Sequence, residues 1–432
     1  MIFNKKNDCK ISFKADAEIE ILNILSQHIQ SHSVFKNHVY LVGGLVRDFL
    51  LNLPIKDIDL VVDFPRGAQK FCEDLHQSFP DITSTPHELG RGYPIWHVMI
   101  KKIGVDIAET QKECFPDSQS RQRLTTFGTF AEDILRRDFT INMLAYDFTT
   151  DQILDPCGCG LKDLKAGLIQ THPELNPDKV FSDDPLRMLR AVRFACKFNF
   201  KISENTKASI TKNSERLKIV SSERILSELE KIVTAGQFPK ALGLLNELGL
   251  FPFVFKNLEF DRMNLSHNLK KIQKAPQTLK AQFAFLGINQ NLEHFTEFLQ
   301  FLKLDNQTRQ SLLKTVAGLK ELTQPLVPWT DLHKRAWARK YHAVLENIFA
   351  VEPDLKTDFA QALKVPIRLK PLIDVDALKK TYQLQGEQIQ KVLSKALELE
   401  DRWILENQKE IPAQLSWQLL ADFIKTSPTV NE

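Results

Sequence analysis

Two aspartates separated by one residue, Asp57 and Asp59, open an apolar run that reads DIDLVVDF. Residues two apart in a β-strand point to the same face, so this spacing predicts two neighbouring carboxylates with Ile58 on the opposite face. Such carboxylates repel each other unless a cation lies between them, and closely spaced oxygen ligands suit Mg²⁺, particularly when a triphosphate supplies the remaining ligands. A lone Asp-x-Asp more often caps a strand or forms a turn, so the metal assignment depends on the residues around it.

A glycine turn lies ten to fifteen residues before this pair. The expected strand Val39–Val42 leads into Gly43 and Gly44, and a helix is expected to open at Leu45. Free backbone N–H groups and the positive end of a helix dipole face an anion in this geometry, and Arg47 could add a bidentate phosphate contact. A Gly-Gly turn alone is weak evidence, but the turn and the carboxylate pair together are much more specific.

A third acid is expected on a neighbouring strand to complete such a site. Asp106 lies in GVDIAE with apolar neighbours on both sides, so it shares a face with other inward residues of its strand. We assign Asp106 as the third carboxylate. The competing interpretation is an exposed acid of a strand.

Further polar side chains lie in the segment Ala131–Asp147, AEDILRRDFTINMLAYD, which we expect to be a helix. On a helix, Arg137, Asp138 and Asn142 form a polar stripe beside an apolar one. That stripe offers one cation, one acid and one amide to a bound ligand. The alternative is a surface helix with an internal Arg–Asp pair.

The segment SDDPLRMLRAVRF, residues 182–194, carries the most information about a substrate. Pro185 suits the first position of a helix, so Asp184 is the expected N-cap. Three arginines follow at intervals of three residues: Arg187, Arg190 and Arg193. They cover about half of the helix circumference opposite apolar side chains and require an anionic partner. A phosphate chain or RNA would supply it, whereas a purely structural account needs several acids that we cannot place from the sequence.

The pair Asp184 and Arg187 also suits the recognition of particular bases. Cytosine and adenine each present an amino donor beside a ring-nitrogen acceptor, which fits a carboxylate next to a guanidinium. Uracil and guanine present a carbonyl and a ring N–H there, and the same pair would repel them. Buried polar groups left unpaired discriminate strongly, so the pair predicts selectivity for C and A.

Two kinds of local pattern show which elements position these residues. Short β-rich runs recur before about Leu154, at Val39–Val42, Asp57–Phe64, Ile95–Ile100 and Gly104–Glu109. After about Asp184 the apolar residues fall at helical spacing almost without interruption. We expect an α+β chain with a mixed sheet in a head (residues 1–154), followed by an all-α neck (155–235), body (236–345) and tail (346–432).

Composition excludes several classes of protein. The chain has 432 residues, of which 43% are apolar and 26% charged, so disordered, collagen-like and coiled-coil classes are out. It has no apolar run long enough to span a membrane, and its first residues have no apolar region behind their lysines, so we expect a soluble cytoplasmic protein without a membrane partner. The widely spaced cysteines, apart from Cys157-Gly158-Cys159, are expected to be reduced thiols.

The net charge of +3 is unevenly distributed. Residues 251–340 contain 14 Lys and Arg against 7 Asp and Glu, a charge of +7, which leaves −4 for the remainder. This stretch is either a solvated lysine face or a surface that follows a phosphate backbone. It is the best candidate for RNA contact.

Taken together, five segments resemble a known family. They are GGLVRD (residues 43–48), Asp57-x-Asp59, RRDFTINMLAYD (136–147), DDPLRMLRAVRF (183–194) and SERILSELEKIV (222–233). Their order and spacing resemble the bacterial class II CCA-adding tRNA nucleotidyltransferases and their close relatives, the bacterial poly(A) polymerases. The resemblance covers a little over half of the chain, and it implies a head like that of DNA polymerase β, a neck that recognises the base, a helical body and an RNA-binding tail.

The resemblance also implies roles for matching residues. Asp57 and Asp59 would bind two Mg²⁺ ions for phosphoryl transfer from the triphosphate to the tRNA 3′-hydroxyl, with pyrophosphate as the leaving group. Together with Asp106, assigned above from its strand, the predicted catalytic carboxylates are Asp57, Asp59 and Asp106. The predicted nucleotide-binding residues are Gly43, Gly44, Arg47, Arg137, Asp138, Asn142, Asp184, Arg187, Arg190 and Arg193. Among them Asp184 and Arg187 would serve as the protein template for C and A.

The family often carries an arginine where this chain has Gln111, which puts one nucleotide or primer contact in doubt. We predict a template-independent enzyme that adds or repairs the 3′ CCA end of tRNA from CTP and ATP. The segment Cys114–Phe130 corresponds to the loop that relatives use to switch from CTP to ATP. The alternatives are a poly(A) polymerase, which residues 88–100 somewhat resemble, an A-adding enzyme, or a catalytically silent RNA-binding relative.

Overall fold

The structure is a computed structural model that describes residues 16–54, 58–89, 93–114, 124–259, 275–323 and 329–426. The chain forms two compact units. The first comprises Met1–Glu228 and Lys240–Val254, and the second comprises Leu229–Pro239 and Phe255–Glu432. The division into head, neck, body and tail remains a prediction.

A seven-stranded mixed sheet forms the centre of the head. Its strand order is β3 (His87–Leu89), β4 (Ile95–Ile100), β5 (Ile103–Glu109), β2 (Ile58–Val62), β1 (Val39–Val42), β8 (Ala145–Asp147) and β9 (Gln152–Leu154). Only β2 and β5 pair in parallel, and the other described neighbours are antiparallel. The predicted mixed sheet is confirmed, and the strands expected at Val39–Val42 and Ile95–Ile100 have those bounds.

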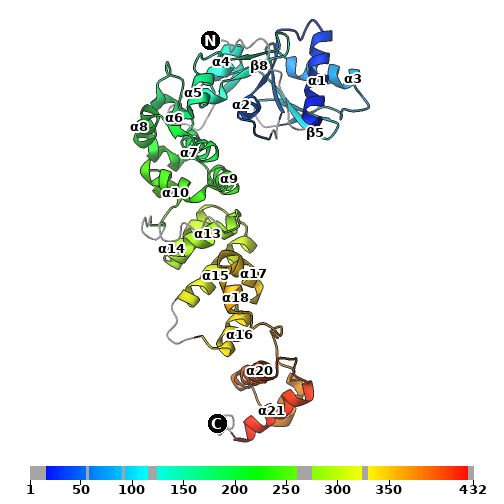
Figure 1. The fold of residues 1–432 in the computed structure, drawn as a ribbon, viewed down its shortest axis with the longest axis vertical. Helices are drawn as coiled ribbons and strands as arrows, with labels where there is room; N and C mark the ends of the chain where they lie inside the picture. The colour runs from blue at the N-terminus through cyan, green and yellow to red at the C-terminus, as the bar shows by residue number, and fades with distance from the viewer. Residues whose placement is uncertain are drawn as a thin grey trace. The chain divides into compact units, whose positions relative to one another are not determined.

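Two helices lie together at the head (Figure 1). They are α1 (Asp16–Ser31) and α3 (Gly67–Ser78), and the rings of His28 and Phe71 join them at a centroid distance of 5.4 Å. Helix α3 packs against β2, β4 and β5 through residues that recur at helical spacing. The crossover through α3 lets the parallel strands β2 and β5 lie side by side.

The expectation of one helix over Ala131–Asp147 is wrong. Helix α4 covers only Phe130–Leu135, a 3₁₀ turn covers Thr140–Asn142, and the last residues form β8. Phe139 is extended, and the Asp138 carboxylate accepts the backbone N–H of Phe139 at 2.9 Å. Side-chain bonds of this kind compete with helix formation, and β8 gains backbone pairing with both β1 and β9.

Helices predominate after the sheet. In the first unit they are α5 (Gly160–Ala166), α6 (Pro177–Asp183), α7 (Leu186–Phe198), α8 (Glu204–Asn213), α9 (Ser222–Thr234, which runs into the second unit), α10 (Phe238–Glu247, whose first two residues are in the second unit) and α11 (Phe251–Val254). Two short parallel strands, β10 (Leu168–Ile169) and β11 (Lys201–Ile202), interrupt the region expected to be all helical. Two residues are too few to show a period in the sequence.

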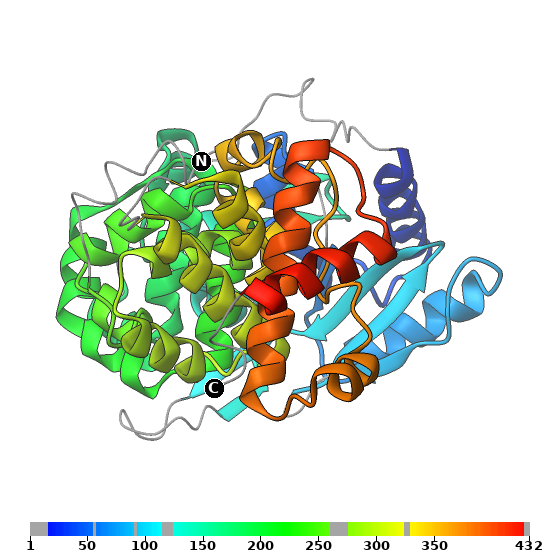
Figure 2. The same ribbon diagram turned by 90° about the horizontal axis from the view of Figure 1, so that it is seen from below.

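The second unit is helical throughout its described part. Its helices are α13 (Leu279–Ile288), α14 (Leu292–Phe301), α15 (Asn306–Thr323), α16 (Asp331–Lys340), α17 (Leu345–Val351), α18 (Asp354–Asp358), α19 (Val375–Tyr382), α20 (Glu387–Asn407) and α21 (Ala413–Thr426). Helices α20 and α21 cross each other in Figure 2. Among the described helices, none is long and apolar enough to cross a membrane.

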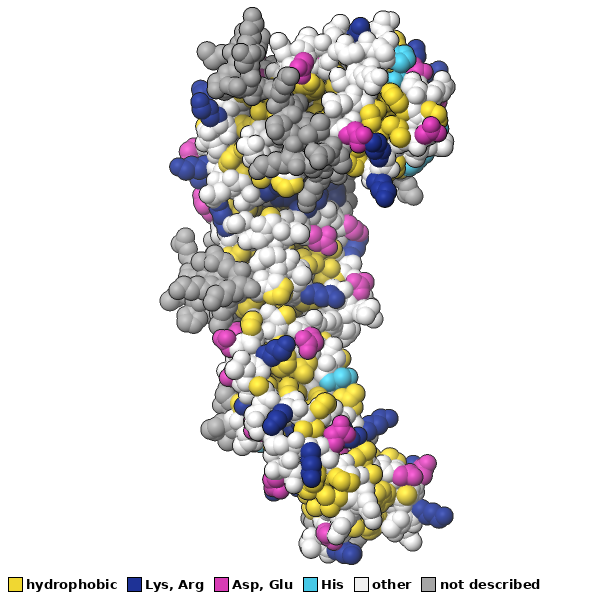
Figure 3. All heavy atoms as spheres, turned by 45° about the vertical axis from the view of Figure 1, so that its right-hand side comes forward, with side chains coloured by type: hydrophobic (Ala, Val, Ile, Leu, Met, Phe, Trp, Pro, Cys, Tyr) yellow, Lys and Arg dark blue, Asp and Glu magenta, His cyan; other side chains and the backbone are white. Residues whose placement is uncertain are grey.

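Part of the basic stretch 251–340 is buried in the interior of the second unit. Arg335 is 0% exposed and donates to Asp401 at 2.8 Å and to the carbonyls of Ala362 and Val365. On the face shown in Figure 3, Lys and Arg side chains are dispersed among Asp and Glu side chains. Residues 260–274 and 324–328 of this stretch lie outside the described part of the chain. Its role in RNA contact stays a prediction.

Candidate active site

The two parallel strands of the sheet bring two predicted acids side by side. Asp59 on β2 and Asp106 on β5 are register partners, and the Asp106 side chain is 46% exposed. Carboxylate oxygens on adjacent strands are the donors that Mg²⁺ prefers, so this arrangement fits a divalent cation. Asp57, the predicted second metal ligand, lies outside the described residues. Among the described residues, no group of three or more His, Cys, Asp or Glu is arranged to hold a metal. Cys157 and Cys159 therefore belong to no such group in the described part of the chain.

The glycine turn lies directly beside these acids. Gly43 has φ +76°, a conformation that side-chain-bearing residues rarely adopt. A Cβ atom at Gly43 would lie 3.2 Å from Oδ2 of Asp59 and 3.7 Å from Nη1 of Arg137. Helix α2 (Gly44–Leu50) follows, one residue earlier than expected. The fold thus brings Gly43, Asp59 and Arg137 together from three segments.

A buried carboxylate fixes Arg137 at this place. Asp133 on α4 accepts from Arg137 Nη2 at 2.7 Å, from Arg136 at 2.7 Å and from the backbone N–H of Gln111 at 3.0 Å. Burial alone would raise the pKa of Asp133, but the two guanidinium groups outweigh it and lower the pKa. The Nε of Arg137 is buried and has no acceptor among the described residues. The Nη1 of the same guanidinium would lie 3.7 Å from a Cβ atom at Gly43, so this group borders the space beside Asp59.

Arg47 is placed differently from the predicted phosphate contact. It is 4% exposed, and its guanidinium donates to Asp48 at 2.7 Å and to the side-chain oxygen of Asn142. Its guanidinium carbon also lies 5.0 Å and 4.7 Å from the ring centroids of Phe194 and Phe198 on α7. In this geometry Arg47 joins α2 to α7.

The predicted association of Asp138 with Asn142 occurs without a continuous helix. The Asn142 amide donates to Asp138 Oδ1 at 2.7 Å, and Arg190 Nε donates to Asp138 Oδ2 at 2.6 Å. Burial by itself would raise the pKa of Asp138, but Arg190 and Asn142 hold that pKa at about 2. The carboxylate is therefore ionised at neutral pH and links the segment after α4 to α7.

The structure supplies the acids that a structural account of the arginine series needs and that the sequence could not place. Arg190 pairs with Asp138, Arg193 donates to Glu228 at 2.6 Å, and Arg187 lies 3.8 Å from Glu113. Arg187 also donates to the carbonyl of Arg136 at 2.6 Å. These acids come from β6 (Gln111–Cys114), the segment after α4, and α9, so helical spacing within 182–194 could not reveal them. The charges have protein partners before any ligand binds.

The structure places Pro185, not Asp184, at the N-cap of α7, which begins at Leu186, one residue later than predicted, and Asp184 is the C-cap of α6. Oδ1 of Asp184 accepts the backbone N–H of Leu186 at 3.2 Å, and both carboxylate oxygens accept from Arg224 Nη2, at 3.2 and 3.1 Å. Arg187 donates its backbone N–H to the carbonyl of Asp184 at 3.0 Å. The two predicted base-reading side chains thus carry separate partners, and their template role stays a prediction.

Sequence reasoning missed one histidine at the acids. His97 on β4 faces Asp106 in antiparallel register, and its Nδ1 lies 2.6 Å from Asp106 Oδ1. Both residues stand equally far from the hairpin turn between β4 and β5, so counting outward from that turn would have found the pair.

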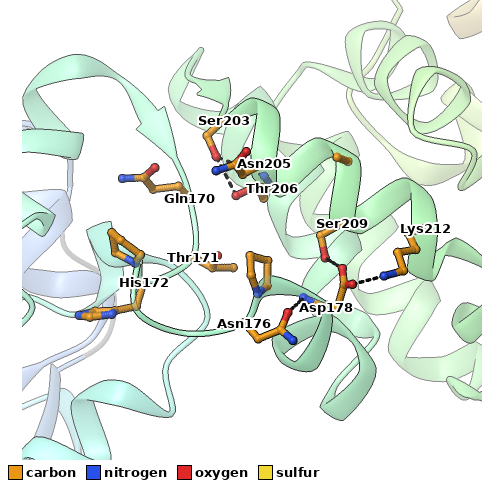
Figure 4. A pocket seen from close by; sticks show the side chains of 13 residues that line it. Gln170, Thr171, His172, Asn176, Asp178, Ser203, Asn205, Thr206, Ser209 and Lys212 are labelled. Atoms are coloured by element: carbon orange, nitrogen blue, oxygen red, sulfur yellow. Dashed lines mark hydrogen bonds and ion pairs between the residues drawn. The ribbon is translucent and has the colours of Figure 1, made fainter.

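A separate polar pocket of about 490 Å³ lies between the segment after β10 and helices α6 and α8 (Figure 4). In it Asp178 accepts from Ser209 at 2.5 Å and pairs with Lys212. None of the predicted site residues lines this pocket.

Comparisons with known proteins agree with this arrangement. Residues 39–170 match the model of the Poly A polymerase head domain, and residues 199–261 match that of a probable RNA and SrmB-binding site of polymerase A. A CCA-adding enzyme from Anoxybacillus flavithermus is 31% identical over 300 residues, 68% of this chain and 70% of that protein. The tRNA nucleotidyltransferase cca1 of Schizosaccharomyces pombe is 35% identical over 256 residues, 56% of this chain and 50% of that protein.

Two solved structures share the fold. The Bacillus stearothermophilus CCA-adding enzyme in complex with CTP superposes with a TM-score of 0.68 at 22% identity, covering 95% of this chain and 98% of that one. The Thermotoga maritima CCA-adding enzyme complexed with tRNA_CCA superposes with a TM-score of 0.67 at 21% identity, covering 96% and 97%.

Proposed function

The chain belongs to the family of CCA-adding enzymes and tRNA nucleotidyltransferases, and from this premise we propose that it adds or repairs the 3′-terminal CCA of tRNA from CTP and ATP. The resemblance predicted from the five sequence segments is confirmed, as is the fold of a polymerase-β-like head followed by helices. The observation that carries the proposal is the register of Asp59 with Asp106 beside Gly43 and Arg137.

The carboxylates supply the centre for transfer. Asp59 and Asp106, with Asp57 outside the described residues, would hold two Mg²⁺ ions. When bound there, the ions lower the pKa of the primer 3′-hydroxyl and neutralise charge on the triphosphate. The Arg137 guanidinium, through its Nη1 side, donates to a phosphate oxygen, and Gly43 keeps the space between Arg137 and Asp59 free of a side chain.

Base recognition is assigned to the start of α7. Asp184 accepts the amino group that C and A share, and Arg187 donates to their ring nitrogen. Arg190 and Arg193, held by Asp138 and Glu228, support this end of the helix rather than meeting the triphosphate themselves. Because the buried acids fix these guanidinium groups, the recognition surface is organised before the nucleotide arrives.

A poly(A) polymerase is the second candidate, because the head matches the model named for that enzyme. An A-adding enzyme shares the same chemistry and differs in the primer that it accepts. The experiment is incubation with Mg²⁺ and labelled CTP or ATP on three primers: tRNA lacking CCA, tRNA ending in CC, and a short unstructured RNA.

Each outcome has one meaning. Addition of C and then a single A to the first primer establishes CCA addition. Addition of A alone to the CC primer identifies an A-adding enzyme, and long A tails on every primer identify a poly(A) polymerase. Absence of incorporation on all three primers refutes the proposal and leaves a silent RNA-binding relative.

A further inference from the structure

His97 is tied to the acids of the site by position and by contact. Asp59, Asp106, His97 and His87 are successive register partners across β2, β5, β4 and β3. In this row His97 Nδ1 lies 2.6 Å from Oδ1 of Asp106. An ionised carboxylate can only accept hydrogen bonds, so Nδ1 carries the hydrogen of this contact.

A glycine provides the space that the imidazole occupies. Gly104 precedes Asp106 by two residues on β5, so the two share a face of the sheet. A Cβ atom at Gly104 would lie 2.7 Å from Cε1 of His97, which no real Cβ contact tolerates. His97 Nε2 also lies 3.4 Å from the sulfur of Met99. The ring is therefore held in one orientation over β5.

We propose that His97 is a positioning residue that fixes the Asp106 carboxylate for transfer. The Asp106 side chain is nearly half exposed and would otherwise rotate among staggered conformations. A hydrogen bond from Nδ1 to Oδ1 selects one of them and leaves Oδ2 for a divalent cation beside Asp59. This inference rests on the proposed function, because it assigns Asp106 to the metal-binding carboxylates.

The expected loss of activity on removing His97 can be taken from other metal sites in proteins. Hydrogen-bond partners of metal-binding side chains orient the ligand, and their removal costs about 10- to 100-fold in metal affinity or activity. His97 has no place against a base or sugar in this proposal. Its loss should therefore reduce kcat and metal affinity while leaving the KM for CTP unchanged.

Two amide substitutions separate positioning from general packing. In H97N the side-chain amide nitrogen occupies the place of Nδ1, whereas in H97Q it lies one bond further out, near the place of Nε2. We expect H97A and H97Q to lower kcat by about 10- to 100-fold and H97N to keep most of the activity. H38A, at an exposed histidine of the same unit, is the control and should leave kcat unchanged.

Gly104 gives an independent arm of the test. G104A should displace the imidazole and lower kcat as H97A does, and G104A should add no further loss in the H97A background, because its effect acts through the ring. Additive losses in the double variant would instead mean that Gly104 acts on the strand itself and would overturn the argument from the glycine.

Titration of the full chain with Mn²⁺ alone, monitored by electron paramagnetic resonance, measures metal binding without catalysis. We expect weaker Mn²⁺ binding in H97A and H97Q and wild-type binding in H97N. Failure of the wild-type chain to incorporate nucleotides on any primer would refute the proposed function, and the Mn²⁺ titrations would then decide the role of His97 alone. Wild-type Mn²⁺ affinity in H97A, or a folded H97N variant as impaired as H97A, overturns the inference.

Discussion

A buried histidine in the head provides a quantitative prediction about pH and stability. His28 on α1 is 1% exposed, and neither of its ring nitrogens has a partner among the described residues. Its ring packs against those of His32, Phe35, Phe71 and Phe79. Burial, with a smaller repulsion from His32, lowers the pKa of His28 from 6.5 to about 4.

The sign of the effect follows from where the proton binds. Below pH 6.5 the unfolded chain protonates this histidine, whereas the folded head keeps it neutral until about pH 4. The head therefore loses stability as the pH falls from 6.5 towards 4, by about 2 kcal/mol at pH 5 and about 3 kcal/mol in full. Above pH 6.5 this contribution does not change.

Substitution of His28 by leucine removes the titrating group at similar size. We compare the free energy of unfolding of H28L with that of wild type at two pH values. The advantage of H28L should be about 2 kcal/mol larger at pH 5 than at pH 7.5. At both pH values H28L also avoids the cost of burying the two imidazole nitrogens without hydrogen bonds, which is about 1–3 kcal/mol for each nitrogen. The leucine changes shape within a packed cluster, which offsets part of this gain.

Amide hydrogen exchange on the full chain measures the effect locally. Peptides from α1 and α3 report the free energy of opening of the head separately from the second unit. H38Q, at an exposed histidine of the same head, is the control and should keep the pH dependence of wild type. An equal loss of protection between pH 7.5 and pH 5 in wild type and H28L would refute the reasoning.

Three further substitutions test the site and the second unit. D59A should abolish nucleotide transfer while tRNA binding survives, measured by single-turnover incorporation and gel shift; unchanged transfer would remove Asp59 from the metal site. R187A should admit UTP or lose nucleotide preference in competition assays, and retained C and A selectivity would remove its template role. R335M should destabilise the chain by about 3–5 kcal/mol in denaturant unfolding, because it removes the donor from Oδ1 of the buried Asp401, whose Oδ2 keeps Arg339, and from the carbonyls of Ala362 and Val365. The exposed R402M should be nearly neutral, and an equal loss in both would contradict this assignment.

Local patterns in the sequence were sufficient for the elements that hold the site. The apolar runs at Val39–Val42 and Ile95–Ile100 form strands with those bounds, and the segment after Pro185 forms α7. The turn at Gly43 has the positive φ that only glycine adopts readily. These features depend on interactions between near neighbours along the chain, so a single sequence contains the information.

Contacts between segments that are distant in the sequence determined the features that local patterns did not predict. The acids that pair with Arg187 and Arg193 are Glu113 and Glu228, which no spacing rule connects to α7. The helical pattern of Ala131–Asp147 gave way to β8, because pairing with β1 depends on a strand about a hundred residues earlier.

The sequence by itself therefore determined which residue types were present for metal and nucleotide chemistry and which local elements carry them. The tertiary structure decided that Asp106 lies beside Asp59, that His97 contacts Asp106, and that the arginines of α7 are already paired. The reason is physical: side-chain periodicity reports which face a residue occupies, whereas the partner on that face comes from whichever strand or helix the fold brings there.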